Sequence, residues 1–448
     1  MTKPTDSVVA PTTRVDPRTD QPRGGSIRSL RAAVAGNIVE WFDWTLYAVF
    51  STYIAAHFFD KSDPSSALLA TLAVFAVGFA ARPFGGIVFG RIADKYGRKA
   101  VLILTISTMA LASLVMAVLP GYDQIGVWAS VMLLLARLVQ GLAHGGESGV
   151  SYTYVAEIAP RDRRGLWSSS VFFAVTLGVM GATALGAALT GLLGEEATAR
   201  YGWRLAFVVG ALLGLLVLWL RKSASESHAF VDESKMNAQP ALSRLSVLKI
   251  GGLVVLLSCG HNCAYYVWAT FAPSFAISSR GMASSSAFLA SLAAQAVALG
   301  LILCWGATSD RIGRRPQIIA MGIAAIVLYF PLSRLISDQP WTLFAAQAIG
   351  MGVWAMGASM YPAMISELFP TRMRATGVAF ATSVSVAAFG GTAPFLLTWS
   401  NQHDVVWAFW LWVGFLSFLA IIGGLLVRET KGSDLEVTVS PFRRSRSK

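Results

Sequence analysis

The chain has 448 residues, of which 55% are hydrophobic and 13% are charged, and its mean hydropathy is +0.58. Soluble domains carry about 25% charged residues, so this composition excludes an ordinary soluble protein and indicates one that crosses the lipid bilayer many times. The net charge of +12 does not indicate a nucleic-acid partner, because Lys and Arg are scattered over short segments between apolar runs.

The first 29 residues are rich in Thr, Pro, Asp and Arg and contain no apolar core. This composition predicts a disordered cytoplasmic tail over residues 1–29 and no cleavable signal peptide. The three cysteines, Cys259, Cys263 and Cys304, lie in apolar segments and are odd in number. We therefore expect no disulfide framework, no metal site and no bound cofactor.

The first apolar run, residues 30–59, is long enough to span the membrane yet carries Glu40 and Asp43 near its middle. An ionised carboxylate costs at least about 2.5 kcal/mol at the bilayer centre, so both acids need water, a cation or a bound proton. Polar and aromatic residues share their stripe at helical spacing, namely Asn37, Trp44 and Tyr47. We interpret this stripe as the lining of a transport pathway; the alternative places the acids at a helix end.

Eleven further apolar runs follow, at residues 66–92, 98–119, 125–158, 165–194, 203–221, 247–278, 284–309, 316–336, 341–367, 374–399 and 404–427. We therefore predict an all-α membrane protein with twelve transmembrane helices. The predicted parts are a first six-helix bundle (30–221), a cytoplasmic linker (222–246), a second six-helix bundle (247–427) and a cytoplasmic tail (428–448).

The basic residues predict the orientation. If the N-terminus is inside, the inner segments hold 29 Lys and Arg residues and the outer segments hold five. Positive residues concentrate on the cytoplasmic side, so both termini are expected in the cytoplasm. Arg82 and Arg137 lie within predicted helices and need another explanation.

Two loop motifs occur twice. GRIADKYGRK (90–99) returns as GATSDRIGRR (306–315), displaced by 216 residues, and EIAPRDRR (157–164) returns as ELFPTRMR (367–374), displaced by 210. Repeats in matching positions indicate two homologous halves, a known transporter plan with the binding site at their interface.

With this duplicated loop, the sequence resembles the major facilitator superfamily over residues 30–427. GNIVEWFDW (36–44), ARPFGG (81–86), RLVQGLAHGGE (137–147) and the EIAP segment resemble its metabolite:proton symporter group, which carries oxoglutarate, citrate, shikimate, proline or betaine. The resemblance implies a transporter in the cytoplasmic (inner) membrane rather than an enzyme. No HExxH, GxSxG or phosphate-loop motif occurs in the sequence.

The resemblance also implies a cytoplasmic gate. In one access state Asp94 would contact the start of the eleventh helix, Arg98 would pair with Glu157, and the second half would repeat this cluster. The alternative is that these charges only orient the helices. The predicted gate residues are Gly90, Asp94, Gly97, Arg98, Glu157, Asp310, Gly313, Arg314, Glu367 and Arg374, with Gly97 and Gly313 permitting tight turns.

Buried polar residues of the first half suggest charge handling. Arg82 is predicted either to neutralise an acid of the first helix or to contact the substrate. The same two alternatives apply to Arg137. Gln140 and His144 follow Arg137 at helical spacing. His144 has the properties of a proton shuttle, with a hydrogen-bonded core histidine as the alternative.

The second half offers aromatic and hydrogen-bonding side chains. No Asp, Glu, Lys or Arg lies deep within its six predicted helices, so we expect substrate recognition there, with packing as the alternative for the aromatic residues. The candidate residues are His261, Asn262, Tyr265 and Trp268 on the seventh helix and Trp354 and Tyr361 on the tenth.

Together these features predict proton-coupled uptake of a small polar metabolite by a monomer through rocker-switch alternating access. The most direct candidate is an organic acid, either a di- or tricarboxylate or an aromatic acid. Glu40 or Asp43 would carry the proton, which is the coupling ion, and Asn37, Tyr47 and the two arginines would join the substrate site. The alternatives are a symporter of a zwitterionic osmolyte, a proton-driven efflux antiporter of the same fold, a substrate sensor and a membrane enzyme.

Overall fold

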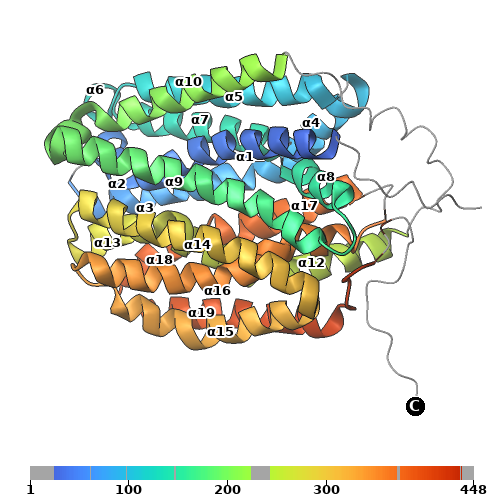
Figure 1. The fold of residues 1–448 in the computed structure, drawn as a ribbon. Helices are drawn as coiled ribbons and strands as arrows, with labels where there is room; N and C mark the ends of the chain where they lie inside the picture. The colour runs from blue at the N-terminus through green and yellow to red at the C-terminus, as the bar shows by residue number, and fades with distance from the viewer. Residues whose placement is uncertain are drawn as a thin grey trace, which may run out of the picture.

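The computed structural model describes residues 25–60, 62–96, 98–145, 148–222, 243–370, 374–433 and 435. Nearly all of these residues are helical, as the apolar runs predict. Figure 1 shows the helices running side by side as two stacked groups, the first half of the chain in blue to green and the second in yellow to red.

The first half forms six spans, three of which are built from two consecutive helices. Its helices are α1 (Gly25–Val49), α2 (Ser51–Phe58), α3 (Pro64–Ala80), α4 (Arg82–Tyr96), α5 (Arg98–Val118), α6 (Tyr122–Ile125), α7 (Val127–Gly145), α8 (Ser148–Ile158), α9 (Arg164–Ala197) and α10 (Trp203–Lys222). The short α6 lies in a connection, and a π-helical turn, Thr198–Gly202, joins α9 to α10.

The second half also forms six spans, and two of them contain a π-helical segment. Its helices are α12 (Arg244–Tyr265), α13 (Ala272–Arg280), α14 (Ser284–Ile312), α15 (Arg314–Leu335), α16 (Pro340–Ser366), α17 (Arg374–Ser385), α18 (Ala393–Gln402) and α19 (Val406–Leu426). The π segments are Tyr266–Phe271, between α12 and α13, and Val386–Gly390, between α17 and α18.

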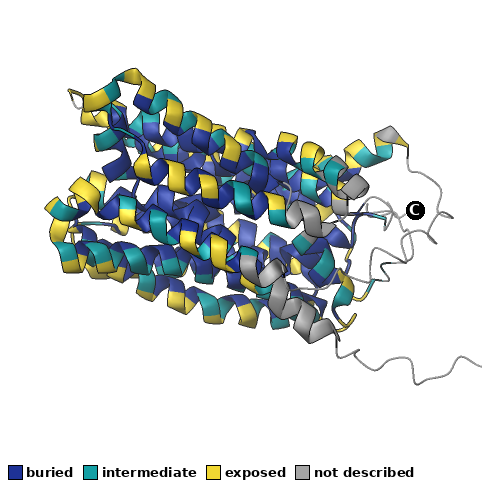
Figure 2. Ribbon diagram, turned by 90° about the horizontal axis from the view of Figure 1, so that it is seen from above, coloured by how far each residue is buried: buried dark blue, intermediate teal, exposed yellow. Residues whose placement is uncertain are grey.

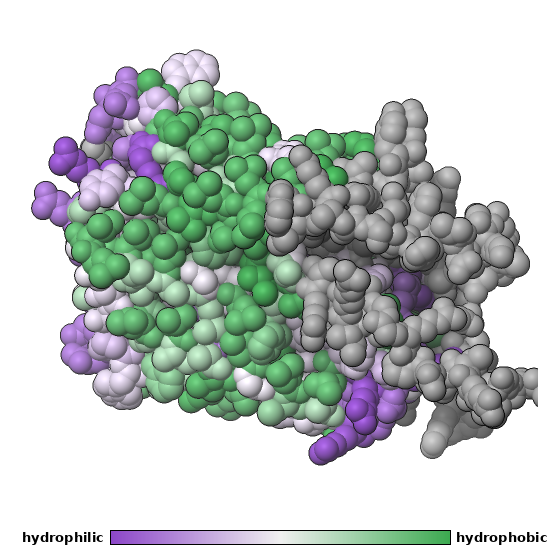
Figure 3. All heavy atoms as spheres, turned by 45° about the horizontal axis from the view of Figure 1, so that its top comes forward, coloured by the Kyte–Doolittle hydropathy of each residue, from purple (hydrophilic) through white to green (hydrophobic). Residues whose placement is uncertain are grey.

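The prediction of twelve transmembrane helices is confirmed. Nine helical stretches of the described residues are long and apolar enough to cross a membrane, and one of them, Arg164–Leu218, contains two spans. The acid-bearing α1 and the less apolar α5 complete the set. Figure 2 shows the buried residues gathered along the inner faces, and Figure 3 shows apolar side chains covering the flank between polar ends. Such a surface fits contact with lipid.

One end of the bundle carries both repeated loop motifs, and we call it the charged end. There α4, α8, α14 and α16 finish and α5, α9, α15 and α17 begin, on the right of Figure 1. The opposite end carries α2, α6 and α13 (Figure 1). These two ends define the two sides from which the interior is reached.

Glycines let the helices that carry the buried arginines approach closely. A Cβ on Gly85 of α4 would meet the backbone of Leu142, and one on Gly145 of α7 would meet the backbone of Arg82. A larger side chain would push α4 and α7 apart, since backbone contacts of this kind require small residues. The Arg-Pro-Phe-Gly-Gly sequence thus holds Arg82 beside α7.

Candidate functional site

Glu40 of α1 is paired with a histidine on α7. Its Oε1 lies 2.9 Å from Nδ1 of His144, and the side chains are 3% and 0% exposed, respectively. A carboxylate and an imidazole are both able to gain or lose a proton near neutral pH when their surroundings shift them. The pair can therefore hold a proton in the protein interior.

Asp43, one turn further along α1, belongs to a separate polar network. Its carboxylate accepts hydrogen bonds from the hydroxyl of Ser113 and from Nε2 of Gln140, the latter at 3.1 Å. Gln140 also donates to Ser113 at 2.8 Å and accepts a bond from Nη1 of Arg137 at 2.7 Å. Arg137 thus reaches Asp43 through Gln140 rather than directly.

The two intramembrane arginines share an aromatic neighbour. The guanidinium carbon of Arg137 lies 4.1 Å from the ring centre of Trp44 and 4.4 Å from that of Tyr47. The guanidinium carbon of Arg82 lies 4.2 Å from the Trp44 ring and 4.0 Å from the Phe79 ring. Electron-rich ring faces stabilise both cations away from water.

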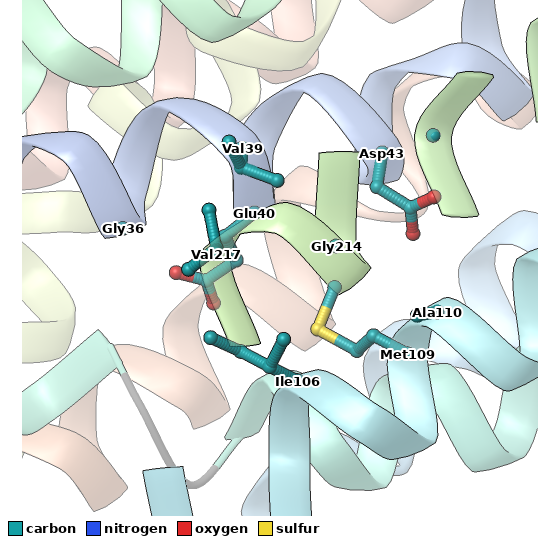
Figure 4. A pocket seen from close by; sticks show the side chains of 10 residues that line it. Gly36, Val39, Glu40, Asp43, Ile106, Met109, Ala110, Gly214 and Val217 are labelled. Atoms are coloured by element: carbon teal, nitrogen blue, oxygen red, sulfur yellow. The ribbon is translucent and has the colours of Figure 1, made fainter. Parts of the chain in front are cut away.

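A small pocket of about 20 Å³ lies beside the two acids. Figure 4 shows Glu40 and Asp43 on α1, with α5 and α10 supplying the facing wall. The other lining residues are small or apolar, namely Gly36, Val39, Ile106, Met109, Ala110, Gly210, Gly214 and Val217. This volume is enough for a water molecule.

A second cavity, the central cavity, lies between the halves and has a volume of about 30 Å³. It is lined by Trp41, Arg82, Tyr152, Phe172, His261, Asn262, Tyr265, Tyr266, Thr382, Ser383 and Val386. This space accommodates one or two water molecules but not a metabolite with several carbon atoms. The structure is thus closed around its centre.

Four of the predicted substrate residues line this central cavity: Arg82, His261, Asn262 and Tyr265. Sequence reasoning missed Trp41, Tyr152, Phe172, Tyr266, Thr382, Ser383 and Val386. Trp41 directly follows Glu40, and Thr382 and Ser383 form a polar pair in an apolar span, so both signals were present in the sequence. Tyr152 and Phe172 gave no such signal, because single aromatic residues are common in membrane helices.

Several predicted residues lie just outside the cavity lining. The His261 ring stacks on Trp354, with ring centres 5.6 Å apart, and on Tyr361, at 5.2 Å. Asn37 donates to the hydroxyl of Ser151 at 2.8 Å. The Tyr47 hydroxyl donates to a backbone carbonyl in α3 at 3.0 Å. A role of these residues in substrate contact stays a prediction.

Trp268 does not lie on the same helix face as His261, Asn262 and Tyr265, where the sequence predicted it. It lies in the π segment, where its ring is 5.7 Å from those of Tyr329 and Trp410, within the core of the second half. A π turn holds more residues than an α turn, so it rotates every following side chain around the axis. Regular α spacing beyond Tyr265 therefore gave the wrong face for Trp268.

At the charged end, two arginines from the repeated motif each reach across to the other half. Nη1 of Arg164, in the first half, lies 2.9 Å from Oε1 of Glu367, and Nη1 of Arg374, in the second half, lies 2.8 Å from Oε1 of Glu157. The Arg164 and Glu367 side chains are at most 3% exposed. The duplicated sequence thus produces two reciprocal ion pairs that hold the halves together.

Asp310 caps a helix of the opposite half. Its two carboxylate oxygens each accept a hydrogen bond at 2.8 Å, from the backbone nitrogens of Gly165 and Leu166 at the start of α9. Arg314 pairs with Asp310 at 2.8 Å and lies 3.9 Å from Glu367. A carboxylate at a helix N-terminus is stabilised by the free backbone N–H groups and the helix dipole.

The segment after α19 joins this cluster. Glu429 accepts hydrogen bonds from the backbone nitrogens of Arg314 and Arg315, at 2.9 and 3.1 Å, directly after Gly313. Gly313 has a φ of +104°, which a residue with a side chain rarely adopts. Further on, the Ser433 carbonyl accepts a bond from Arg164 at 3.0 Å. The segment therefore contacts both halves.

Burial raises the pKa of the Glu367 carboxyl, although Arg314 and Arg164 both act to lower it. The reason is that the ionised form loses its hydration when the side chain is fully buried. This carboxyl lies just beyond the end of α16, at the charged end. Its proton affinity therefore depends on whether that end is closed.

The opposite end is also closed by contacts between the halves. The Ser274 hydroxyl, on α13, donates to the carbonyl of Ala48 on α1 at 2.9 Å. Glu195 accepts from the Tyr53 hydroxyl at 2.8 Å and from the backbone nitrogen of Ser284 at 3.2 Å. Both ends are thus held shut around the central cavity, which describes an occluded state.

Comparison with known proteins identifies the family. A model described as Major Facilitator Superfamily matches residues 33–392. The chain belongs to this superfamily. The family and the relatives of this major facilitator protein are transporters rather than enzymes, which confirms the prediction from the repeated loop motifs.

Three relatives of this chain have names that refer to different substrates. The chain is 33% identical to the "Alpha-ketoglutarate permease" of Escherichia coli (strain K12) over 91% of its own length and 95% of the relative. It is 34% identical to a "Putative proline/betaine transporter" of Staphylococcus aureus (strain MSSA476), over 83% and 81%. It is 32% identical to the "Citrate-proton symporter" of Klebsiella pneumoniae, over 84% and 85%.

Solved structures support the fold. One described as "D-xylose-proton symporter" gives a TM-score of 0.69 at 18% identity, covering 91% of this chain and 99% of that one. A proton:xylose symporter with a bound halogenated sugar gives 0.72 at 17% identity, covering 92% and 98%. At this identity the likeness concerns the twelve-helix architecture alone.

Part of the predicted gate of this major facilitator protein is not described. Gly90, Asp94, Gly97 and Arg98 lie outside the residues whose side chains the structure describes. The pairing predicted for Arg98 and the latch predicted for Asp94 therefore stay predictions. Within the described part of the chain, the partner of Glu157 is Arg374 from the other half.

Proposed function

We propose that this protein is a secondary active transporter that takes up a small organic acid together with protons. The observation behind this proposal is that the buried acids of α1 lie against side chains that can be neutral. Oε1 of Glu40 lies 2.9 Å from Nδ1 of His144, and Asp43 is hydrogen-bonded to Ser113 and Gln140. Either acid can accept a proton without leaving a fixed ion pair broken, and the alpha-ketoglutarate and citrate carriers among the relatives fit this reaction.

In the proposed cycle, Glu40 or Asp43 takes a proton from the outer side, and the substrate carboxylate binds Arg82 in the central cavity. Proton and substrate together reduce the charge buried at the centre. The two halves then rock, and the ion pairs and the Asp310 cap at the charged end separate to release both into the cell. The occluded structure lies between the two open states.

The excess of Lys and Arg at the charged end supports a cytoplasmic position for that end and for both termini, in the inner membrane. A protease-sensitive tag at either terminus should then be cleaved in inside-out vesicles and protected in right-side-out ones. We further propose that the protein works as a monomer, which light scattering in detergent measures directly.

The coupling role is tested in proteoliposomes with an imposed pH gradient, using labelled oxoglutarate, citrate and benzoate as probes. Glu40→Gln or Asp43→Asn should abolish accumulation against a gradient. The same variant should still exchange internal for external substrate, because exchange needs no net proton movement. If both variants still accumulate substrate in response to pH, the acids of α1 do not carry the coupled proton.

A second candidate function is uptake of a zwitterionic osmolyte, favoured by the aromatic rings around the cavity and by the proline/betaine relative. Labelled glycine betaine in the same vesicles separates the two candidates. Expulsion of substrate from energised vesicles would instead identify an efflux antiporter.

A further inference from the structure

The central cavity contains a single fixed charge. Among its lining residues Arg82 is the one cation, and no acid faces it. Glu40 lies within electrostatic reach of Arg82, but it lies outside the cavity lining, and its Oε1 is 2.9 Å from Nδ1 of His144. The charge that a bound molecule meets first is therefore one buried guanidinium.

Arg82 also has unused donors. Its Nε and Nη2 atoms have no hydrogen-bond partner within the described part of the chain, and the same holds for the Tyr265 hydroxyl on the other side of the cavity. The Tyr266 hydroxyl lies beside the Arg82 side chain. Buried donors without acceptors are unfavourable, and a carboxylate offers two acceptor oxygens to a planar fork of this kind.

The only other titratable nitrogen base in the lining is His261. Its ring lies between neighbours that are aromatic, with interplanar angles of 14° to Trp354 and 29° to Tyr361. An imidazolium buried there would lack a counter-ion among the lining residues. His261 is therefore neutral, and the cavity lining carries one positive charge, that of Arg82.

The remaining surface is largely aromatic. Trp41 and Tyr265 meet edge to face, with ring centres 5.4 Å apart, and Phe172 meets His261 at 5.7 Å. Thr382 and Ser383 of α17 add hydroxyl groups on the side of the second half. Flat rings favour a flat apolar body, and the hydroxyls favour polar substituents on it. The cavity must widen to admit such a body, as alternating access requires.

Building on the proposed function, we propose that the substrate is a ring-bearing acid with one carboxylate and no cationic group. The carboxylate binds Arg82 and the tyrosine hydroxyls, and the ring lies among Trp41, Phe172 and Tyr265. A second carboxylate would be buried without a cation, and an ammonium group would be buried beside Arg82 without an acid. Both arrangements carry an uncompensated charge, which is costly away from water.

The test is binding to the purified full-length protein, measured by thermal shift and by competition between ligands. Benzoate and 4-hydroxybenzoate should bind at least about tenfold more tightly than phthalate, oxoglutarate, citrate or glycine betaine, because each of these adds one or more uncompensated charges. Benzyl alcohol, which has the ring without the charge, should bind weakly.

Two variants of matched charge complete the test. Arg82→Gln should remove the preference for benzoate over benzyl alcohol. Arg280→Gln removes an arginine that lies beside Phe275 at the far end of α13 and should leave the preference intact. If Arg82→Gln does not fold, the ligand ranking of the unchanged protein still decides the proposal.

The outcomes separate this proposal from the proposed function. Tighter binding and proton-coupled uptake of oxoglutarate or citrate would overturn the single-carboxylate assignment and leave acid symport standing. Preferential binding of glycine betaine would overturn both. A protein that binds none of these acids would also overturn the assignment, whereas benzoate uptake that ignores the pH gradient would overturn only the proton coupling.

Discussion

Four carboxylates within the described part of the chain form two sets that differ in their partners. In the middle of the first span, Glu40 lies 2.9 Å from a histidine, and Asp43 is hydrogen-bonded to a serine and a glutamine. Glu367 and Asp310, at the charged end, are bonded to arginines and to the N-terminus of a helix. The same functional group can exchange a proton within one half in one place and join the two halves in the other, because its partners differ.

This difference matches the positions of the two sets. The first set lies within one half, so its protonation can change without separating the halves. The second set contains the pairs that join the halves at the charged end, so it must break whenever that end opens. The predictions that follow test this division, beginning with the largest expected effect.

Arg164→Gln should have the largest effect, since it leaves Glu367 buried without its nearest cation. Removing one partner of a buried ion pair costs about 3 to 5 kcal/mol. In this protein the loss destabilises the state that is closed at the charged end relative to the open state. The cavity should therefore open towards that end. Ser383→Cys, in a Cys304→Ser background, should react faster with a polar thiol reagent applied from the charged side.

The matched control is Arg163→Gln, one residue earlier. The Arg163 side chain is 70% exposed and lies 3.6 Å from Asp162, which is 76% exposed, so this ion pair contributes little to stability. Equal reaction rates in the Arg164 and Arg163 variants would show that the Arg164 pair does not hold the charged end shut.

Asp310→Asn should have a smaller effect, of about 1 to 2 kcal/mol on the closed state, because the amide still caps α9 but loses its charge. The melting temperature should fall by less than in Arg164→Gln. Asp338→Asn, an exposed change in the connection between α15 and α16, is the control. A fall as large as that of Arg164→Gln would mean that the cap, not the ion pair, dominates.

The closure of the charged end should depend on pH. The pKa of Glu367 is raised by burial in the closed state and returns towards its usual value when the end opens to water. The closed state therefore binds the proton more tightly, so falling pH stabilises it and rising pH through the raised pKa removes that stabilisation. Arg164 from α9, Arg314 from α15 and Arg428 from the tail face this carboxyl and moderate the effect.

This dependence is limited to about 1.4 kcal/mol per pH unit for one proton. Spin labels on Asp162→Cys and Arg311→Cys, one in each half, should report shorter distances as pH falls. The dependence should disappear in Glu367→Gln. An unchanged pH dependence in that variant would assign the titration to another group.

Glu40→Gln should have the smallest effect on stability, under about 1 kcal/mol, since the amide has nearly the shape of the carboxyl and can form a hydrogen bond with His144. Its melting temperature should stay close to that of the unchanged protein while accumulation of substrate is lost. A large destabilisation would show that Glu40 is a structural ion-pair member, and the two sets would then not differ in kind.

Much of the architecture follows from the sequence. Apolar runs of spanning length, short basic loops and the two repeated motifs predict twelve helices in two homologous halves, because lipid requires helices with satisfied backbones. Glu40 and Asp43 mark the first span as a candidate functional site, because an ionised carboxylate in the membrane interior costs free energy. The repeat also places an arginine and a glutamate at equivalent positions in each half.

Only the tertiary structure decides which of these groups meet. It joins Arg164 to Glu367 and Arg374 to Glu157, and it turns Arg82 rather than Arg137 into the central cavity. It also turns Trp268 into the core of the second half, through a π segment. Sequence periodicity reports which face of a helix a residue occupies, whereas pairing across the halves depends on where helices cross and how a local π turn rotates them.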